Sequence, residues 1–295
     1  MSCDDVGQMK ITSDTPSVAV CSIAPHAPIL RNDQVHVWQA LLDETPSQVD
    51  CFLRSLAADE RARADRFYFE RDRQHYIVAR GTLRTIVSHY LNRPPQSLSF
   101  RYGAHGKPAL AAEPDEEAIR FNASHSHGVA LFAISSGREV GIDLEYMRAD
   151  SEIEQVARRF FSRQEISTLL ALPADLRRCA FFHCWTRKEA YIKARGEGLS
   201  LALDQFDVSL IPGEAAALLG TRPDPGEAAR WSLRELSAVM PGYAASLAVE
   251  GHGWSLTVGD WLSSRKVPFR FHESCDARRE IGSGKAIARV AELRD

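Results

Sequence analysis

Residues 140–145 of the 295-residue chain read Val-Gly-Ile-Asp-Leu-Glu, a short alternation of apolar and acidic residues. In a β-strand, successive side chains point to opposite faces, so Asp143 and Glu145 share one face while Ile142 and Leu144 face a core. Two neighbouring carboxylates repel each other, and a hard cation such as Mg²⁺, which prefers oxygen ligands, relieves that repulsion. Taken alone, these residues fit an ordinary solvent-facing acidic strand at least as well.

A second segment, residues 185–193, reads Trp-Thr-Arg-Lys-Glu-Ala-Tyr-Ile-Lys, and a Gly-Glu-Gly loop follows at 196–198. On a helix, residues four apart share one face, so Trp185, Glu189 and Lys193 form one stripe. Glu189 could then supply a third carboxylate for the cation, and Lys193 could hold a phosphate or stabilise a leaving group. A surface Glu–Lys pair is the alternative, but the large Trp185 on the same stripe argues against a fully solvated face.

A third polar cluster, Asn-Ala-Ser-His-Ser-His at 122–127, lies between two apolar stretches with the composition of strands. Small polar residues in this position indicate either the lining of a cleft or a hydrogen-bonded turn. Ser124 beside His125 is also reminiscent of hydrolases, but no G-x-S-x-G motif is present here. His125 fits better as a phosphate ligand, together with Lys107 in a Gly-Lys-Pro turn and arginines of the first half.

Away from these motifs, helical and strand-like patterns indicate an α+β fold. Strands are predicted at 34–42, as two short strands within 119–134, and at 137–145, 205–211, 230–237 and 243–249. Helices are predicted from a start at Pro46 with Ser47 as N-cap, through the Arg-rich stretch that ends at Leu91, and at 151–172 and 176–195.

Short sequence matches recur in the same order along the chain. Arg-Phe-Tyr-Phe at 66–69 is followed by Arg-Phe-Phe-Ser at 159–162, and Ala-Arg-Gly at 79–81 by Ala-Arg-Gly at 194–196. Such matches also arise by chance, so two related α+β halves and a coincidence both remain open.

The composition restricts the class of protein. Hydrophobic residues make up 44% and charged residues 25%, which is typical of a globular protein. A net charge of −3 argues against a generally basic nucleic-acid binder. No uncharged apolar run is long enough to cross a membrane, and the acidic N-terminus is unlike a signal peptide. Six scattered cysteines without a CxxC motif indicate free thiols, and we expect a cytoplasmic protein.

The motifs together resemble the 4'-phosphopantetheinyl transferases of the larger, Sfp type. The resemblance is carried by the strand 140–145, the Arg-Phe-Phe-Ser segment at 159–162 and the segment 185–199. The Phe-Asn-Ala-Ser-His-Ser segment at 121–126 and the Gly-Lys-Pro turn at 106–108 occupy the places expected for that family. It covers roughly residues 35–250.

The resemblance implies a fold and a reaction. The fold is an α+β, sandwich-like arrangement of two pseudo-symmetric halves in one monomeric chain, with the active site at their interface. Members bind coenzyme A and Mg²⁺, with Mn²⁺ as an alternative ion, and transfer the 4'-phosphopantetheine arm to a serine of an acyl or peptidyl carrier protein. Adenosine 3',5'-bisphosphate is released. Such carriers belong to fatty-acid, polyketide or nonribosomal-peptide synthesis, and neither nucleic acid nor a membrane is expected as a partner.

The resemblance also assigns roles to residues of this sequence. Asp143, Glu145 and Glu189 would be the metal ligands, and Glu189 would also serve as general base. Lys193 would contact the phosphate and assist the leaving group. The remaining coenzyme A contacts would come from Arg61, Arg63, Lys107, Ser124 and His125, with His125 on the 3'-phosphate.

The Arg-rich helix departs from the family pattern. A position that often carries a basic residue is Glu60 here, and the next nucleotide-side position falls on Tyr76 or Arg80. The expected organisation is a leader at 1–20, an N-terminal half at 21–137, a C-terminal half at 138–254 and an extension of unknown role at 255–295.

Two other functions remain open. One is a Mg²⁺-dependent phosphodiesterase or nuclease that uses the same carboxylates. The other is a non-catalytic module that binds coenzyme A or a carrier protein. The pairing of Lys107 with His125 argues against the first, and the complete set of carboxylates with Lys193 argues against the second.

Overall fold

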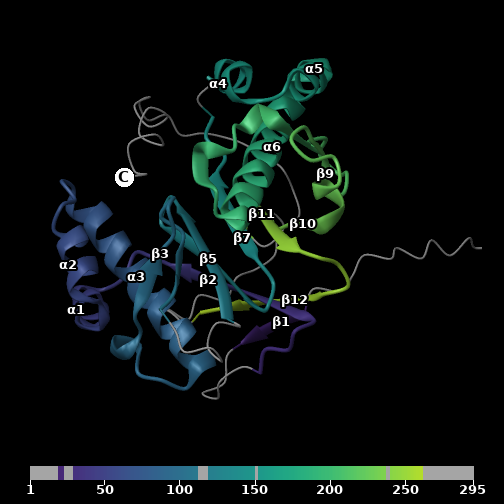
Figure 1. The fold of residues 1–295 in the computed structure, drawn as a ribbon. Helices are drawn as coiled ribbons and strands as arrows, with labels where there is room; N and C mark the ends of the chain where they lie inside the picture. The colour runs from purple at the N-terminus through teal and green to yellow at the C-terminus, as the bar shows by residue number, and fades with distance from the viewer. Residues whose placement is uncertain (1–18, 23–28, 112–118, 150–151, 237–239, 262–295) are drawn as a thin grey trace, which may run out of the picture.

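Two units with the same order of elements follow each other along the chain (Figure 1). The computed structural model describes residues 19–22, 29–111, 119–149, 152–236 and 240–261. The first unit contains β2 (Gln34–Leu41), α1 (Pro46–Ser55), α2 (Ala58–Ala64), α3 (Glu70–Leu91), β3 (Phe100–Tyr102), β4 (Pro108–Leu110), β5 (Ile119–Ser126) and β6 (Val129–Ser136). The second contains β7 (Val140–Tyr146), α4 (Ile153–Phe160), α5 (Arg163–Ala171), α6 (Ala174–Arg195), β8 (Phe206–Val208), β9 (Leu218–Thr221), β10 (Trp231–Glu235) and β11 (Tyr243–Glu250).

The strands of the two units are arranged alike. In the first unit, β6 pairs antiparallel with both β2 and β5; in the second, β11 pairs antiparallel with both β7 and β10. Two further strands, β12 (Ser255–Asp260) and β1 (Ala19–Ser22), extend the first sheet beyond β2. Short 3₁₀ turns complete the description at Pro95–Ser97, Gly198–Ser200, Leu203–Gln205 and Glu227–Arg230. The expectation of two pseudo-symmetric α+β halves is therefore confirmed.

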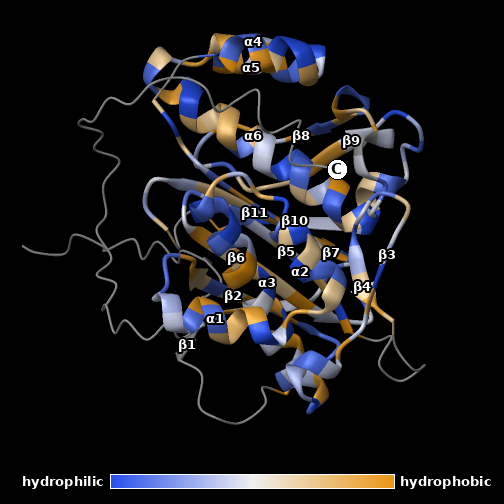
Figure 2. Ribbon diagram, turned by 90° about the vertical axis from the view of Figure 1, so that its left-hand side faces the viewer, coloured by the Kyte–Doolittle hydropathy of each residue, from blue (hydrophilic) through white to orange (hydrophobic). Residues whose placement is uncertain are grey.

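The two sheets pack against each other, and helices cover their outer faces. Alternation along β6 shows this arrangement: Phe132 and Ile134 pack with α1–α3, whereas Leu131 and Ala133 pack toward the second sheet. Ile142 of β7 lies in the core between the sheets, as predicted. Helices α4 and α5 alternate between hydrophobic and hydrophilic residues, as expected for helices that cover a core (Figure 2). The order of layers is helix, sheet, sheet, helix.

Gly141 explains how closely α6 lies on β7. A Cβ atom at this position would overlap the backbone of Ala190 and Ala194 on α6. Because only glycine permits such an approach, the glycine of the Gly-Ile-Asp motif fixes the helix against the strand. The face of β7 that carries Asp143 is consequently the face covered by α6.

The likeness of the halves extends to a buried ion pair in each. Glu60 of α2 accepts hydrogen bonds from the backbone N–H of Ala57 and from Arg84 of α3. In the second half, Glu165 of α5 accepts from the N–H of Ser162 and pairs with Lys188 of α6 at 2.8 Å. Both cations also donate to backbone carbonyls of the segment that follows their helix. The two ion pairs therefore anchor equivalent helices.

Several sequence expectations are corrected. Helix α1 has Thr45, not Ser47, at its N-cap, because Pro46 occupies the first helical position. The predicted helix at 151–172 is two helices, since Ser162 and Glu165 form a capping box that starts α5. The Ala-Arg-Gly match is not structural: residues 79–81 lie inside α3, whereas 194–196 end α6. The leader at 1–20 falls almost wholly outside the described residues.

Two findings concern the environment of the chain. Within the described residues, every helix is too short or too polar to span a bilayer. Cys51, Cys179 and Cys184 are thiols rather than disulfides, as predicted for them.

Candidate active site

The two halves meet where β5 lies beside β7, and side chains join the strands. The backbone N–H groups of Ile142, Leu144 and Tyr146 donate to side-chain oxygens rather than to carbonyls. The acceptors are Asn122 Oδ1 at 2.9 Å, Ser124 Oγ at 3.3 Å and Ser126 Oγ at 3.1 Å. The constant spacing shows that the strands run parallel. We call this ladder of side-chain bonds the seam.

Asp143 is the centre of the predicted site and is almost fully buried. Its Oδ1 accepts from Lys193 Nζ at 2.5 Å and from Ser124 Oγ at 3.0 Å. Its Oδ2 is buried and accepts no hydrogen bond from the residues that the structure describes. A buried carboxylate oxygen without a hydrogen-bond donor destabilises the folded protein, so a bound positive group at this position would be favourable.

Glu145 lies two residues further along the same face of β7. Ser126 Oγ donates to Glu145 Oε2 at 3.1 Å. Burial, and then repulsion from Asp143, raise the pKa of the Glu145 carboxyl to about 7; Lys193 opposes the shift, and Glu189 adds to it. This mutual influence shows that the structure brings together Asp143, Glu145, Glu189 and Lys193.

Glu189 and Lys193 reach the site from α6. Glu189 is buried, and it precedes Lys193 by one helical turn. Lys193 retains 28% side-chain exposure and bridges Asp143 and Ser124. The predicted contact of Lys193 with a phosphate stays a prediction, because in this structure its ammonium is engaged by a carboxylate.

The donor set fits a hard cation. In the part of the chain that the structure describes, no three His, Cys, Asp or Glu side chains already surround one point in metal-binding geometry. Nevertheless, three acidic side chains share the site, one oxygen of Asp143 has no donor there, and the pKa of Glu145 is raised by crowding of negative charge. Carboxylate oxygens are typical Mg²⁺ ligands. The ammonium of Lys193 neutralises part of the negative charge of Asp143.

His125 lies between the two serines on β5 and is exposed to solvent. The surrounding protein still desolvates the imidazole, and together with the positive charge of Lys193 this lowers the pKa of His125 below its usual range. The ring is therefore neutral near pH 7, where it can donate one hydrogen bond to an anion. The influence of Lys193 on this pKa indicates that the two side chains lie near each other.

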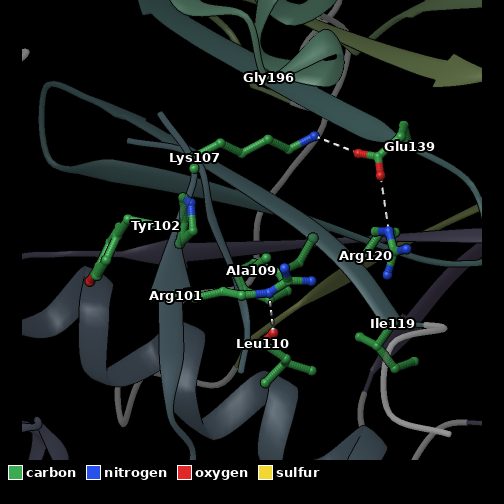
Figure 3. Close-up of a pocket in the computed structure, with 12 residues that line it drawn as sticks. Arg101, Tyr102, Lys107, Ala109, Leu110, Ile119, Arg120, Glu139 and Gly196 are labelled. Atoms are coloured by element: carbon green, nitrogen blue, oxygen red, sulfur yellow. Dashed lines mark hydrogen bonds and ion pairs between the residues drawn. The ribbon is translucent and has the colours of Figure 1, made fainter. Parts of the chain in front are cut away.

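Lys107 joins the two halves at the other end of the seam (Figure 3). Its Nζ donates to Glu139 Oε2 at 2.8 Å and to the carbonyl of Ala194 at 2.7 Å. Glu139 also accepts from Arg120 Nε at 2.9 Å, and these two cations lower its pKa although burial opposes the shift. The three side chains line a cavity of about 260 Å³ with Arg101 and Gly196. Lys107 contacts the helix that carries Lys193, but it contacts none of the three predicted metal ligands.

The predicted arginines lie on α2 and are exposed. Arg61 Nε donates to the carbonyl of Leu56, and the Arg63 guanidinium lies 5.7 Å from the centre of the Tyr76 ring. Within the described residues, neither arginine contacts the carboxylates. Glu60, which departs from the family pattern, has a structural position: Arg80 and Arg84 hold it in the buried ion pair of α2.

The sequence assigned no individual role to Asn122 and Ser126 of the seam, nor to Glu139, which pairs with Lys107 and Arg120. A signal was present, because polar residues at 122, 124 and 126 alternate with Ala123 and His125 and therefore share a face of the strand. The sequence of this cluster indicates the lining of a cleft or a turn. It belongs instead to a strand whose polar face bonds the opposite half of the molecule.

Comparison with known proteins supports this arrangement. The family model of the 4'-phosphopantetheinyl transferase superfamily matches residues 139–248, and that of the 4'-phosphopantetheinyl transferase N-terminal region matches residues 38–137. The 4'-phosphopantetheinyl transferase HetI of Nostoc sp. is 41% identical over 225 residues, which cover 76% of this chain and 91% of HetI. The 4'-phosphopantetheinyl transferase Sfp of Bacillus subtilis is 34% identical over 159 residues, 54% of this chain and 68% of Sfp.

A vertebrate relative is similar over a shorter part. The L-aminoadipate-semialdehyde dehydrogenase-phosphopantetheinyl transferase of Xenopus laevis is 30% identical over 179 residues, 57% of this chain and 59% of that protein. The boundary between the two family models falls at residues 137–139, where the first structural unit ends and the second begins. With two matched models, a relative aligned over nine-tenths of its length and the two-halved fold, the chain belongs to the 4'-phosphopantetheinyl transferase superfamily and is an enzyme of its Sfp type.

Proposed function

We propose that this chain transfers the 4'-phosphopantetheine arm of coenzyme A to a serine hydroxyl of an acyl or peptidyl carrier protein. The serine oxygen forms a bond to the phosphorus that carries the pantetheine. The bond from that phosphorus to the oxygen of the nucleotide 5'-phosphate breaks, and adenosine 3',5'-bisphosphate leaves. The single observation that carries the proposal is the convergence of Asp143, Glu145, Glu189 and Lys193 beside the seam.

Transfer of this kind depends on positioning and charge neutralisation. A serine hydroxyl is a poor nucleophile until a base removes its proton. Glu189 is the proposed base, because its carboxylate lies in the carboxylate site on a rigid helix. Lys193 is the proposed partner of the leaving oxygen, since its ammonium is partly exposed and already reaches the same site.

Asp143, Glu145 and Glu189 would hold a divalent cation, Mg²⁺ or Mn²⁺. Such an ion supplies charge neutralisation at the pyrophosphate when it is bound. The protein contributes the rigid frame: β7 fixes the two acidic residues, and α6 fixes the third.

The nucleotide end of coenzyme A would lie along the first half. His125 is the proposed contact of the 3'-phosphate, because it is exposed beside Lys193. Lys107 would have to exchange Glu139 for a phosphate, whereas Arg61 and Arg63 are exposed and could add charge without breaking an ion pair. Since the seam is formed within one chain, we also propose that the enzyme acts as a monomer.

Intact-mass spectrometry of a carrier protein tests the proposal. The carrier is incubated with the enzyme, coenzyme A and Mg²⁺, and a panel of acyl and peptidyl carriers identifies the preferred substrate. The expected result is a mass gain of one phosphopantetheine arm together with adenosine 3',5'-bisphosphate in solution. Hydrolysis of coenzyme A without carrier modification would instead indicate a phosphodiesterase. Binding without either product would indicate a non-catalytic module.

A further inference from the structure

Ser126 is the last residue of β5, and its hydroxyl lies between the two halves. Its Oγ accepts a hydrogen bond from the Tyr146 N–H at 3.1 Å and donates to Glu145 Oε2 at 3.1 Å. A serine hydroxyl has a single proton. Since a backbone N–H of β7 occupies the acceptor side of the oxygen, the proton is directed at the carboxylate.

The same arrangement recurs one rung earlier in the seam. Ser124 Oγ accepts from the Leu144 N–H and donates to Asp143 Oδ1. Each serine of β5 thus accepts a hydrogen bond from a backbone N–H of β7. Its hydroxyl donates a hydrogen bond to the carboxylate of the β7 residue just before that N–H. The repetition shows that the seam holds both carboxylates in the same way, each by the serine opposite it.

The turn after Ser126 holds the serine in place. His127 adopts a left-handed backbone with φ of 47°, and its ring stacks on that of Tyr146 with 4.4 Å between the centroids. The Tyr243 hydroxyl donates to the His127 carbonyl at 3.0 Å. Tyr146 of β7 and Tyr243 of β11 therefore both hold the end of β5, which keeps the Ser126 backbone beside Glu145.

Strands β12 and β2 of the first sheet provide a contrast. They also run parallel, but they pair through their backbones along six residues. Backbone pairing suffices to join two strands. Between β5 and β7, serine and asparagine side chains make the hydrogen bonds instead, at the position where the acidic residues lie. This difference indicates that these side chains do more than join the two strands.

The geometry assigns Ser126 as a positioning residue that orients the Glu145 carboxylate toward the bound divalent cation. This inference rests on the proposed function, because it assumes that Glu145 is a ligand. A partner that orients a ligand carboxylate in this way typically changes metal affinity by ~10–100-fold when it is removed. Ser126 would accordingly act on cation binding without touching the nucleotide.

Calorimetric titration of Mn²⁺ into the full-length protein without coenzyme A tests the assignment. Ser126→Ala should weaken Mn²⁺ binding by ~10–100-fold, and Ser126→Thr, which keeps the hydroxyl, should restore most of the affinity. Ser136→Ala is the matched control, because the hydroxyl of Ser136, at the end of β6, donates to Asn32 Oδ1 in the turn before β2, away from the carboxylates. Ser126→Cys keeps the size with a weaker donor and replaces Ser126→Ala if that variant does not fold.

The unfolding midpoint is measured for every variant. A merely structural Ser126 would lower the midpoint and leave the Mn²⁺ affinity of the folded protein unchanged, which would overturn the assignment. Equal weakening in Ser126→Ala and Ser126→Thr would also overturn it, because the hydroxyl would then be irrelevant. If the wild-type protein itself binds no Mn²⁺ or Mg²⁺, the proposed cation site fails. Unchanged affinity in Ser126→Ala beside a binding wild type defeats the role of Ser126 alone.

Discussion

Replacement of Gly141 by alanine tests how the site is assembled. A Cβ at this position would lie 2.9 Å from the Ala194 Cα and closer still to backbone atoms of Ala190 and Ala194. Backbone atoms of a helix cannot rotate away as a side chain can. Helix α6 must therefore retreat from β7 by roughly 1 Å to restore ordinary carbon contacts.

Two losses follow from that retreat. Overpacking of a core typically costs ~1–3 kcal/mol, and we expect about 3 kcal/mol here because the clash is with a helix backbone. Glu189 and Lys193 move with α6 while Asp143 stays on β7. A displacement of about 1 Å between reacting groups can lower a rate by ~10²-fold. Gly141→Ala should thus lose both stability and transfer activity.

Urea unfolding followed by tryptophan fluorescence measures the first loss, and initial rates of carrier modification measure the second. Gly220→Ala is the matched control, because a Cβ there meets no atom within 4 Å and its φ lies outside the left-handed region. The control should change stability by less than ~0.5 kcal/mol. A Gly141→Ala protein that is as stable and as active as Gly220→Ala would refute the close packing of α6 on β7.

The remaining predictions concern single ionisable groups. Glu189→Gln should lower the maximal rate by ~10²–10⁴-fold at saturating Mg²⁺, because an amide cannot accept the serine proton; full recovery at high Mg²⁺ would leave Glu189 as a ligand only. His125→Ala should weaken coenzyme A by ~1.5–3 kcal/mol and 3'-dephospho-coenzyme A by less in equilibrium binding. Since the pKa of His125 is lowered and a bound phosphate favours imidazolium, wild-type affinity should rise as pH falls toward that pKa, and the variant should lose this rise. Glu60→Gln should destabilise the fold by ~3–5 kcal/mol in urea unfolding, because it leaves a buried guanidinium without its carboxylate. The pKa of Glu60 is lowered in the folded state, so its contribution is present above the unfolded pKa and is lost as pH falls through the folded one; a difference between wild type and variant that does not shrink in acid contradicts this.

Local patterns in the sequence predicted the elements that carry the site. The alternation at 140–145 gave strand β7 with Ile142 inward, and the four-residue spacing gave Glu189 and Lys193 on α6. These patterns are reliable because each depends only on the periodicity of one element. They also grouped Asp143, Glu145 and Glu189, which the structure places within mutual electrostatic influence.

Long-range pairing could not be predicted in the same way. Strand β12 pairs with β2, more than 200 residues earlier, and the residues after Gly251 carry no strong pattern of their own. The pairing of Lys193 with Asp143 likewise depends on how α6 lies across β7, which Gly141 decides. The break between α4 and α5 was foreseeable, because Ser162 and Glu165 have capping-box spacing, but the apolar periodicity continued through it.

Intact-mass analysis of a carrier protein with Asp143→Asn tests the central claim most directly. Asparagine keeps the size of the side chain and its hydrogen bond from Ser124 but removes the charge that Lys193 and a cation would share. Asp50→Asn on the exposed surface of α1 serves as the matched control. The account predicts that wild type and Asp50→Asn add one phosphopantetheine arm to the carrier, whereas folded Asp143→Asn adds almost none in the same time. Carrier modification by Asp143→Asn at the wild-type rate would contradict the assignment of the carboxylates beside the seam as the catalytic site.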